Sequence, residues 1–141
     1  MNLKNRIKMH EGCRLIPYLD TTSNWTIGWG HKMESVSPSI LADGITQDEA
    51  DHLLDVDIGI AENGVSRLPA MVLNNCNEVR RGVLIEMLFQ LGYAGVLKFK
   101  RMLAAIEQGN FGLAAVEMID SRWYDQTPNR VEEMAAIMRD G

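Results

Sequence analysis

The sequence is poor in cysteine, proline and aromatic residues, and it has no long apolar run. Its 141 residues include two cysteines, four prolines, and three each of Trp, Tyr and Phe. Cys13 and Cys76 lack the spacing of a metal-binding or disulfide framework, so we expect reduced thiols. No apolar stretch reaches the roughly 18 residues that a membrane span needs. The first residues, MNLKNRIKMHEG, have no continuous apolar segment, so we expect no secretory signal peptide.

Positive charge is also scarce. The formal net charge is −5 and the isoelectric point is near 5.1, so the basic surface of a nucleic-acid-binding protein is missing and no nucleic-acid partner is expected. An anionic polymer would have to be held by a local site, because the protein as a whole does not attract it. The hydrophobic content of 46% with 23% charged residues is that of a globular protein, and residues 1–141 fit one domain.

Strand-like patterns are confined to one region near the amino terminus. A short helix over 2–11 is expected to stop at Gly12. Alternating polar and apolar residues over 14–31, interrupted by the turn-forming DTTSN, predict a hairpin or small meander in which Pro17 restricts the first strand to an edge or a bulge. The next stretch, MESVSPSILADG, looks like a loop with room for a short strand.

The remaining chain carries helix signals. TQDE at 46–49 forms a capping box and predicts a helix that ends near residues 63–64. Asn77 caps an apolar helix that Gly92 ends. Further helices are expected over 93–98, 100–108 and 112–119, followed by a turn in SRWYDQTPNR and a last helix from Pro128. One β-rich region followed by helices predicts an α+β fold.

Three polar residues of the β-rich region have both ordinary and catalytic interpretations. Glu11 is a surface glutamate or a carboxylic acid that donates a proton. Asp20 is a common turn residue or a second catalytic carboxylate. Thr26 suits a strand because it is β-branched. A helix end, a strand end and a neighbouring strand meet readily, and two carboxyl groups around one volume are what glycoside hydrolysis needs.

Four motifs in order make the chain similar to a known family. They are EG at 11–12, YLD at 18–20, WTIGWGH at 25–31 and SRWYDQTPNR at 121–130. With them, the chain resembles the phage-type lysozymes, glycoside hydrolase family 24, over nearly its whole length. The resemblance implies a lysozyme-like α+β fold in which a small β lobe, about 13–45, is joined by a long helix to a mainly helical lobe, about 65–141 plus the helix 2–11.

The resemblance also implies roles for the three polar residues. Glu11 would protonate the leaving glycosidic oxygen, Asp20 would stabilise oxocarbenium-like charge and assist a water, and Thr26 would position that water. The reaction would cleave β-1,4 links between N-acetylmuramic acid and N-acetylglucosamine in peptidoglycan with inversion, and needs no cofactor. A metal site from His10, Glu11 and His31 lacks a recognised ligand spacing and is not expected.

Other matched positions have implied roles too. Phe89 and Gln90 would contact sugars, and Arg130 would lie near the catalytic glutamate. Phe89 also suits a hydrophobic core, and Arg130 also suits a helix surface. His31 and Asp57 would form a structural ion pair.

Departures from the family leave the binding surface open. The segment between His31 and Gly44 is short, and Lys32, Met102 and Glu117 replace other residue types at sugar-contacting positions. The expectation is a monomeric phage or prophage endolysin that accumulates in the host cytoplasm. It would reach the periplasmic cell wall through a holin, without inserting into the membrane, and lyse the host. The alternatives are a peptidoglycan-binding module with little activity and a lytic transglycosylase, which needs one acid and no water.

Overall fold

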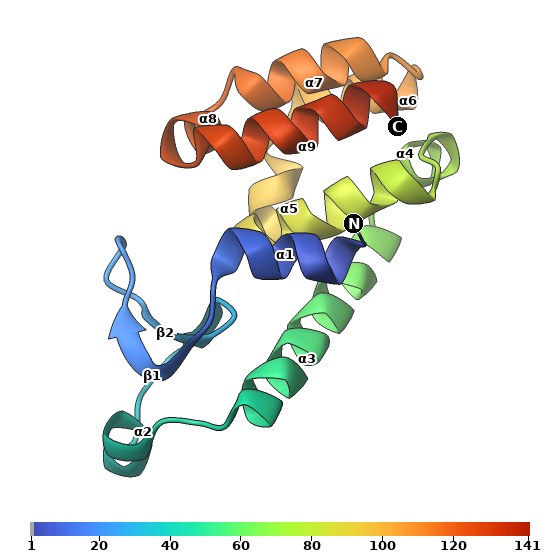
Figure 1. Ribbon diagram of the computed structural model, residues 1–141. Coiled ribbons are helices and arrows are strands. Elements are labelled where there is room, and N and C mark those ends of the chain that lie inside the picture. The colour runs from blue at the N-terminus through green and yellow to red at the C-terminus, as the bar shows by residue number, and fades with distance from the viewer. Residues whose placement is uncertain (1) are drawn as a thin grey trace. The chain divides into compact units, whose positions relative to one another are not determined.

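The computed structural model describes residues 2–141 as helices accompanied by one small antiparallel sheet (Figure 1), so the predicted α+β class is confirmed. The elements in chain order are α1 Leu3–Glu11, β1 Arg14–Leu19, β2 Trp25–Gly28, β3 His31–Met33, α2 Pro38–Asp43, α3 Gln47–Ser66, α4 Ala70–Asn75, α5 Glu78–Leu97, α6 Lys100–Glu107, α7 Phe111–Ile119, α8 Arg122–Gln126 and α9 Pro128–Asp140.

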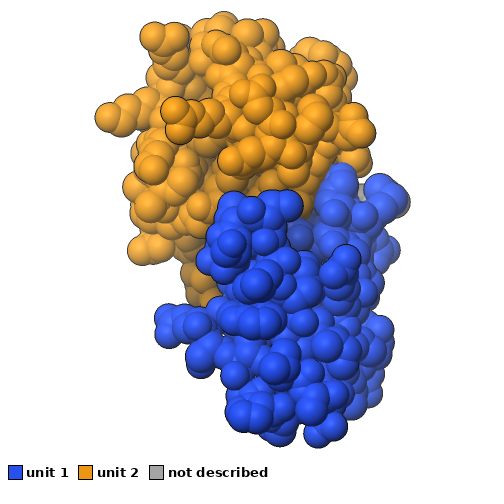
Figure 2. All heavy atoms as spheres, turned by 90° about the vertical axis from the view of Figure 1, so that its left-hand side faces the viewer, with its two compact units in different colours: residues 1–59 blue, residues 60–141 orange. Residues whose placement is uncertain are grey.

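The chain divides into two compact units, residues 1–59 and 60–141 (Figure 2). The first contains α1, the sheet, α2 and most of α3, and the second contains the remaining helices. The boundary lies within α3.

The sheet of the first unit has the order β1-β2-β3, so β1 is an edge strand. Pro17 lies in β1, and the register of β1 against β2 shifts between Arg14 and Tyr18. A proline has no N–H to donate to a neighbouring strand, which explains why this strand lies at the edge and is irregular. The prediction from Pro17 is therefore confirmed.

Local signals set most of the helix ends. Gly12, with a φ of 67°, ends α1. Thr46 Oγ1 accepts from Glu49 N at 3.1 Å and Thr46 N donates to Glu49 Oε1 at 3.0 Å, which is the predicted capping box. Gly92, with a φ of 76°, interrupts α5 where the sequence predicts a helix to end.

Two segments predicted as loop or turn are helical instead. The stretch after β3 forms α2, because Ser37 caps it by accepting from Ile40 N and Pro38 occupies its first position. Arg122–Gln126 forms the five-residue helix α8, which Ser121 caps by accepting from Tyr124 N. In both cases a serine supplies the cap that the sequence prediction overlooked.

The hydrophobic core of the second unit combines aliphatic residues with many methionines. Five methionines in it are fully buried: Met87, Met102, Met118, Met134 and Met138. The ring of Trp123 packs edge-on against Phe99, with 5.9 Å between centroids.

Among the described residues no single helix is long and apolar enough to cross a membrane. The helices α5 and α6, bent by 97° relative to each other, are together long and apolar enough, by length and composition only.

Candidate active site

One row of side chains crosses all three strands of the sheet. Tyr18 on β1 is paired with Thr26 on β2, which is paired with Lys32 on β3. Directly paired residues point to the same face of a sheet, with Cβ atoms about 5 Å apart. Asp20 follows Tyr18 by two positions, where the chain leaves β1, and its side chain meets the far end of Lys32. Asp20, Thr26 and Lys32 are thus gathered on one face.

The carboxylate of Asp20 is held on both oxygens. Oδ1 accepts from Thr22 N at 2.8 Å, from Thr22 Oγ1 at 2.8 Å and from Asn24 N at 2.9 Å. Oδ2 accepts from Lys32 Nζ, and the Asp20 side chain is 17% exposed. The Lys32 ammonium and then the turn donors hold the pKa of Asp20 well below its ordinary range. Asp20 is therefore a fixed and ionised carboxylate.

Thr26 has a buried hydroxyl with directed partners. The residue is 1% exposed. Its Oγ1 donates to Asn24 O at 3.1 Å and lies 3.5 Å from Lys32 Nζ. Because the single hydroxyl proton is used on Asn24, Oγ1 faces other groups as an acceptor.

Glu11 is the last residue of α1, and its carboxyl group lies beside the turn that joins β2 to β3. The turn is attached to the neighbouring helices through Trp29, whose Nε1 donates to Asp51 Oδ1 at 2.8 Å. Lys8 Nζ stands 5.0 Å from the centre of the Trp29 ring. A Cβ atom added to Gly30 would collide with the Glu11 carboxyl group. The close approach of turn and carboxyl thus depends on glycine.

Substitution of Gly30 by alanine is expected to move the Glu11 carboxyl group. Gly30 has a φ of 77°, so alanine adds backbone strain of about 1 kcal/mol to the collision. Gly109→Ala is the matched control, because its φ is 69° and an added Cβ meets nothing within 4 Å. We expect both variants to lose stability in urea unfolding, and only Gly30→Ala to lose tenfold or more of the glycan hydrolysis that the family resemblance implies. Equal activity in the two variants would contradict a role for this contact.

His31 and Asp57 lie away from the face that carries Thr26. His31 is paired with Ile27 and directly precedes Lys32 in β3, so its side chain points to the face opposite that of Lys32. His31 Nδ1 is 2.8 Å from Asp57 Oδ2, which is the pairing that the resemblance implies. This second face lines a mostly apolar cavity of about 490 Å³ together with residues of α2 and α3.

The predicted sugar-contacting residues all lie in the second unit. Gln90 Oε1 accepts from Trp123 Nε1 at 2.8 Å, and Gln90 Nε2 donates to Thr127 Oγ1 at 3.3 Å. Phe89 is partly buried and packs against the core. Arg130 Nε lies 2.9 Å from Glu86 Oε2 in a buried ion pair. Gln90 retains a second N–H on Nε2 for a ligand.

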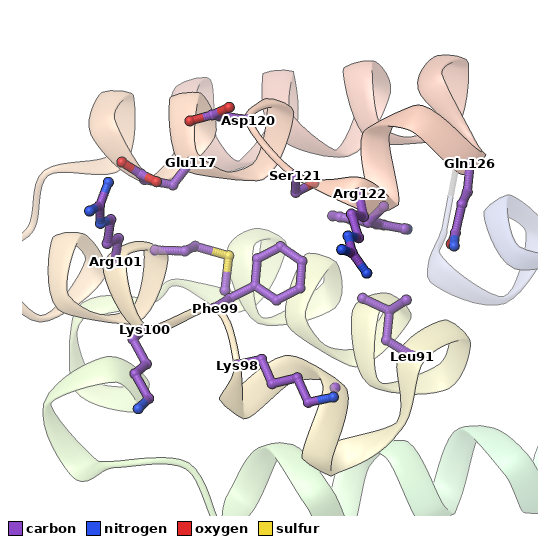
Figure 3. A pocket seen from close by; sticks show the side chains of 13 residues that line it. Leu91, Lys98, Phe99, Lys100, Arg101, Glu117, Asp120, Ser121, Arg122 and Gln126 are labelled. Atoms are coloured by element: carbon purple, nitrogen blue, oxygen red, sulfur yellow. The ribbon is translucent and has the colours of Figure 1, made fainter.

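A cavity of about 500 Å³ in the second unit contains two of the positions that depart from the family (Figure 3). Met102 lines it, and Glu117 and Asp120 contribute carboxylates at and after the end of α7. Basic side chains from the end of α5 and from α6 lie across from these acids, among them Lys98 and Arg101. The lining is therefore mixed in charge, with an apolar floor.

Within residues 2–141, no three His, Cys, Asp or Glu side chains gather as a metal site. Cys13 and Cys76 are free thiols, and burial raises the pKa of Cys76.

Two features of the site were missed by sequence reasoning. The first is the ion pair of Lys32 with Asp20. A signal for it was present, because a short hairpin with its turn at 28–30 places Lys32 opposite Thr26. The other is Glu86, the buried partner of Arg130, which lies 44 positions earlier in the chain. No local sequence signal marks that pair.

Comparison of the sequence with known proteins identifies the family of the chain. The model of the phage lysozyme family matches residues 8–138. A protein called probable T4-type lysozyme 1 from Dictyostelium discoideum is 30% identical over 161 residues, which cover 99% of this chain and 95% of that protein. The endolysin of Bacillus phage PZA is 29% identical, over 97% of this chain and 53% of the endolysin.

A third relative is a much longer protein, of which this chain matches one part. The pre-baseplate central spike protein Gp5 of Enterobacteria phage T4 is 29% identical over all of this chain and 28% of its own length.

The fold and the matches define a glycoside hydrolase of the lysozyme type. The chain belongs to the phage lysozyme family.

Proposed function

We propose that the protein hydrolyses the β-1,4 links between N-acetylmuramic acid and N-acetylglucosamine in peptidoglycan, with inversion at the anomeric carbon. Glu11 donates a proton to the leaving glycosidic oxygen as the bond from the anomeric carbon breaks. Water attacks that carbon and passes a proton to Asp20. The observation that carries the proposal is the ionised Asp20 carboxylate beside the Thr26 hydroxyl on one face of the sheet.

The geometry of Asp20 supports its part in this reaction. Its Oδ1 is held by three donors of its own turn, so the carboxylate keeps its place. A fixed negative charge stabilises an oxocarbenium-like transition state without reorganisation. Thr26 presents an acceptor to a water proton, because its own proton is donated to Asn24.

The substrate-binding role of the second unit rests on two arrangements. Gln90 is fixed at both ends by Trp123 and Thr127, and its second N–H suits the carbonyl oxygen of an acetamido group. Phe89 offers part of its ring for a sugar face, and Arg130, which is paired with Glu86, offers a positive charge for an anionic group of the glycan. We propose these three as substrate contacts.

The biological role proposed is host lysis at the end of a phage or prophage cycle. One relative is an endolysin, which supports this role. In this proposal the protein is a monomer that accumulates in the host cytoplasm and reaches the periplasmic wall after a separate holin opens the membrane. Expressing the protein with and without a holin, and following culture turbidity, tests the dependence: lysis with both proteins and none with either alone is expected.

Product analysis tests the reaction itself. Purified peptidoglycan is incubated with the wild type and with Asp20→Asn, and the released muropeptides are separated and weighed by mass spectrometry. The proposal expects reducing muramic acid ends, formed initially as the α-anomer by NMR, and their loss in Asp20→Asn. Anhydro-muramic acid ends would establish a lytic transglycosylase instead, and binding without release would establish a binding module.

A further inference from the structure

Lys32 is the feature of the polar sheet face that the proposed reaction does not use. It lies in the middle of β3, directly opposite Thr26. Its ammonium forms an ion pair with Asp20 Oδ2 and lies 3.5 Å from Thr26 Oγ1. One cationic group therefore bridges the carboxylate and the hydroxyl that are proposed to hold the attacking water.

The two oxygens of Asp20 are not equivalent. Oδ1 receives three donors from Thr22 and Asn24, which fix the carboxylate within its own turn. Oδ2 receives Lys32. Since Oδ1 is occupied by the turn, Oδ2 is the oxygen that remains for contact with water, and it is the one that the ammonium covers.

We propose that Lys32 is a positioning residue that restrains this site: in the substrate-free protein its ammonium takes the place between Asp20 Oδ2 and Thr26 Oγ1 that the attacking water needs. Turnover then requires the ammonium to move away. The inference rests on the proposed function, because it assigns the water to these two acceptors.

The side chain of Lys32 is built for such displacement. It is 57% exposed, and its flexible four-carbon stem leads to a charge that water solvates well. Asp20 stays in place when the ammonium leaves, because the three donors to Oδ1 come from backbone and side chain of the turn. The restraint is therefore modest and reversible.

Removal of the Lys32 charge is expected to raise kcat. The position of the attacking water is then unblocked, Asp20 becomes a stronger base, and its negative charge is no longer offset beside the developing oxocarbenium ion. All three effects raise the rate at pH values above the pKa of Asp20. We expect a gain in kcat of about two- to fivefold, the factor that corresponds to one solvent-exposed ion pair.

The gain is accompanied by a loss of acid tolerance. The groups that contact Asp20 are Thr22 and Asn24 from its own turn and Lys32 from β3, with Thr26 of β2 next to the lysine, and Lys32 is the charged one among the described contacts. A depressed carboxyl pKa keeps the base ionised as pH falls, so the wild type retains activity in acid. Without the ammonium the pKa of Asp20 rises toward its ordinary value, and activity is lost at higher pH.

The test compares Lys32→Met with Lys32→Arg, which keeps the charge, and with Lys4→Met. Lys4 lies on α1 and pairs with Asp55 at 2.6 Å, so its variant removes one charge from the same unit away from the candidate site. The kcat and KM are measured against pH on soluble glycan strands from peptidoglycan. The Asp20 carboxyl carbon is titrated by NMR in the same proteins without substrate.

We expect Lys32→Met to raise kcat at neutral pH and to move both the acid limb of kcat and the NMR titration of Asp20 to higher pH. Lys32→Arg and Lys4→Met should follow the wild type in the titration. An unchanged Asp20 titration in Lys32→Met overturns the proposal whatever the activity, and so does a fall in kcat. If the Asp20 titration shifts in Lys32→Met but the wild type releases no products from peptidoglycan, the proposed hydrolysis is rejected. The ion pair with Lys32 would then still control the pKa of Asp20.

Discussion

Replacement of Glu11 by glutamine is expected to reduce glycan hydrolysis by about 10²- to 10⁴-fold, the range that one positioned general acid contributes. Glutamine keeps the size of the side chain beside Gly30 and removes the acidic proton that is proposed to pass to the leaving oxygen. The loss should appear in kcat, because the substrate is still bound while the bond breaks without protonation. The measurement is the initial rate of reducing-end release from soluble peptidoglycan strands.

Two variants make the Glu11 result specific. Glu62→Gln changes an exposed glutamate of α3 and should retain the wild-type rate. Glu11→Gln should have the circular dichroism spectrum and the urea unfolding midpoint of the wild type, which shows that the variant is folded. A rate within threefold of the wild type in folded Glu11→Gln would assign the proton donor to another residue.

Elements with strong local signals were predicted well from the sequence. The capping box at Thr46 and Glu49 is made of reciprocal hydrogen bonds three residues apart, and it marks the start of α3 in the sequence itself. Gly92 adopts a positive φ that other residues disfavour, so the interruption of α5 also follows from residue type. Such features need no knowledge of distant contacts.

The two missed helices, α2 and α8, have five or six residues each. Helices of this length show too little apolar periodicity to be recognised, and their stability comes from a serine cap and from the surrounding structure. Serine and proline near Pro38 are equally common in loops, which is why the sequence favoured a loop there.

The candidate site was predicted as a set of residues but not as an arrangement. The types of Glu11, Asp20 and Thr26 suggested acid–base chemistry, and the family resemblance supplied their roles. The covering of Asp20 Oδ2 by Lys32 depends on the register of β2 against β3 and on a side chain that reaches across the sheet. A composition or a motif contains neither of these facts.

Loss of the Arg130 guanidinium is expected to have the largest effect on stability. Glu86 is fully buried and Arg130 is 8% exposed, and their charged groups lie 2.9 Å apart. Arg130→Met leaves the Glu86 carboxylate buried without this partner, which costs about 3–5 kcal/mol. A domain of this size has about 5–15 kcal/mol in total. Urea unfolding followed by circular dichroism measures the difference.

The double variant separates the ion pair from the space that the two side chains fill. If Arg130→Met is destabilising because it takes the guanidinium partner from a buried charge, then adding Glu86→Met removes that charge and restores much of the lost stability. Arg101→Met, at an exposed position of α6, should change stability by no more than about 0.5 kcal/mol. A double variant no more stable than Arg130→Met alone would show that the pair itself stabilises the second unit. The pair would then be structural, and Arg130 would carry its charge for the fold before any contact with substrate.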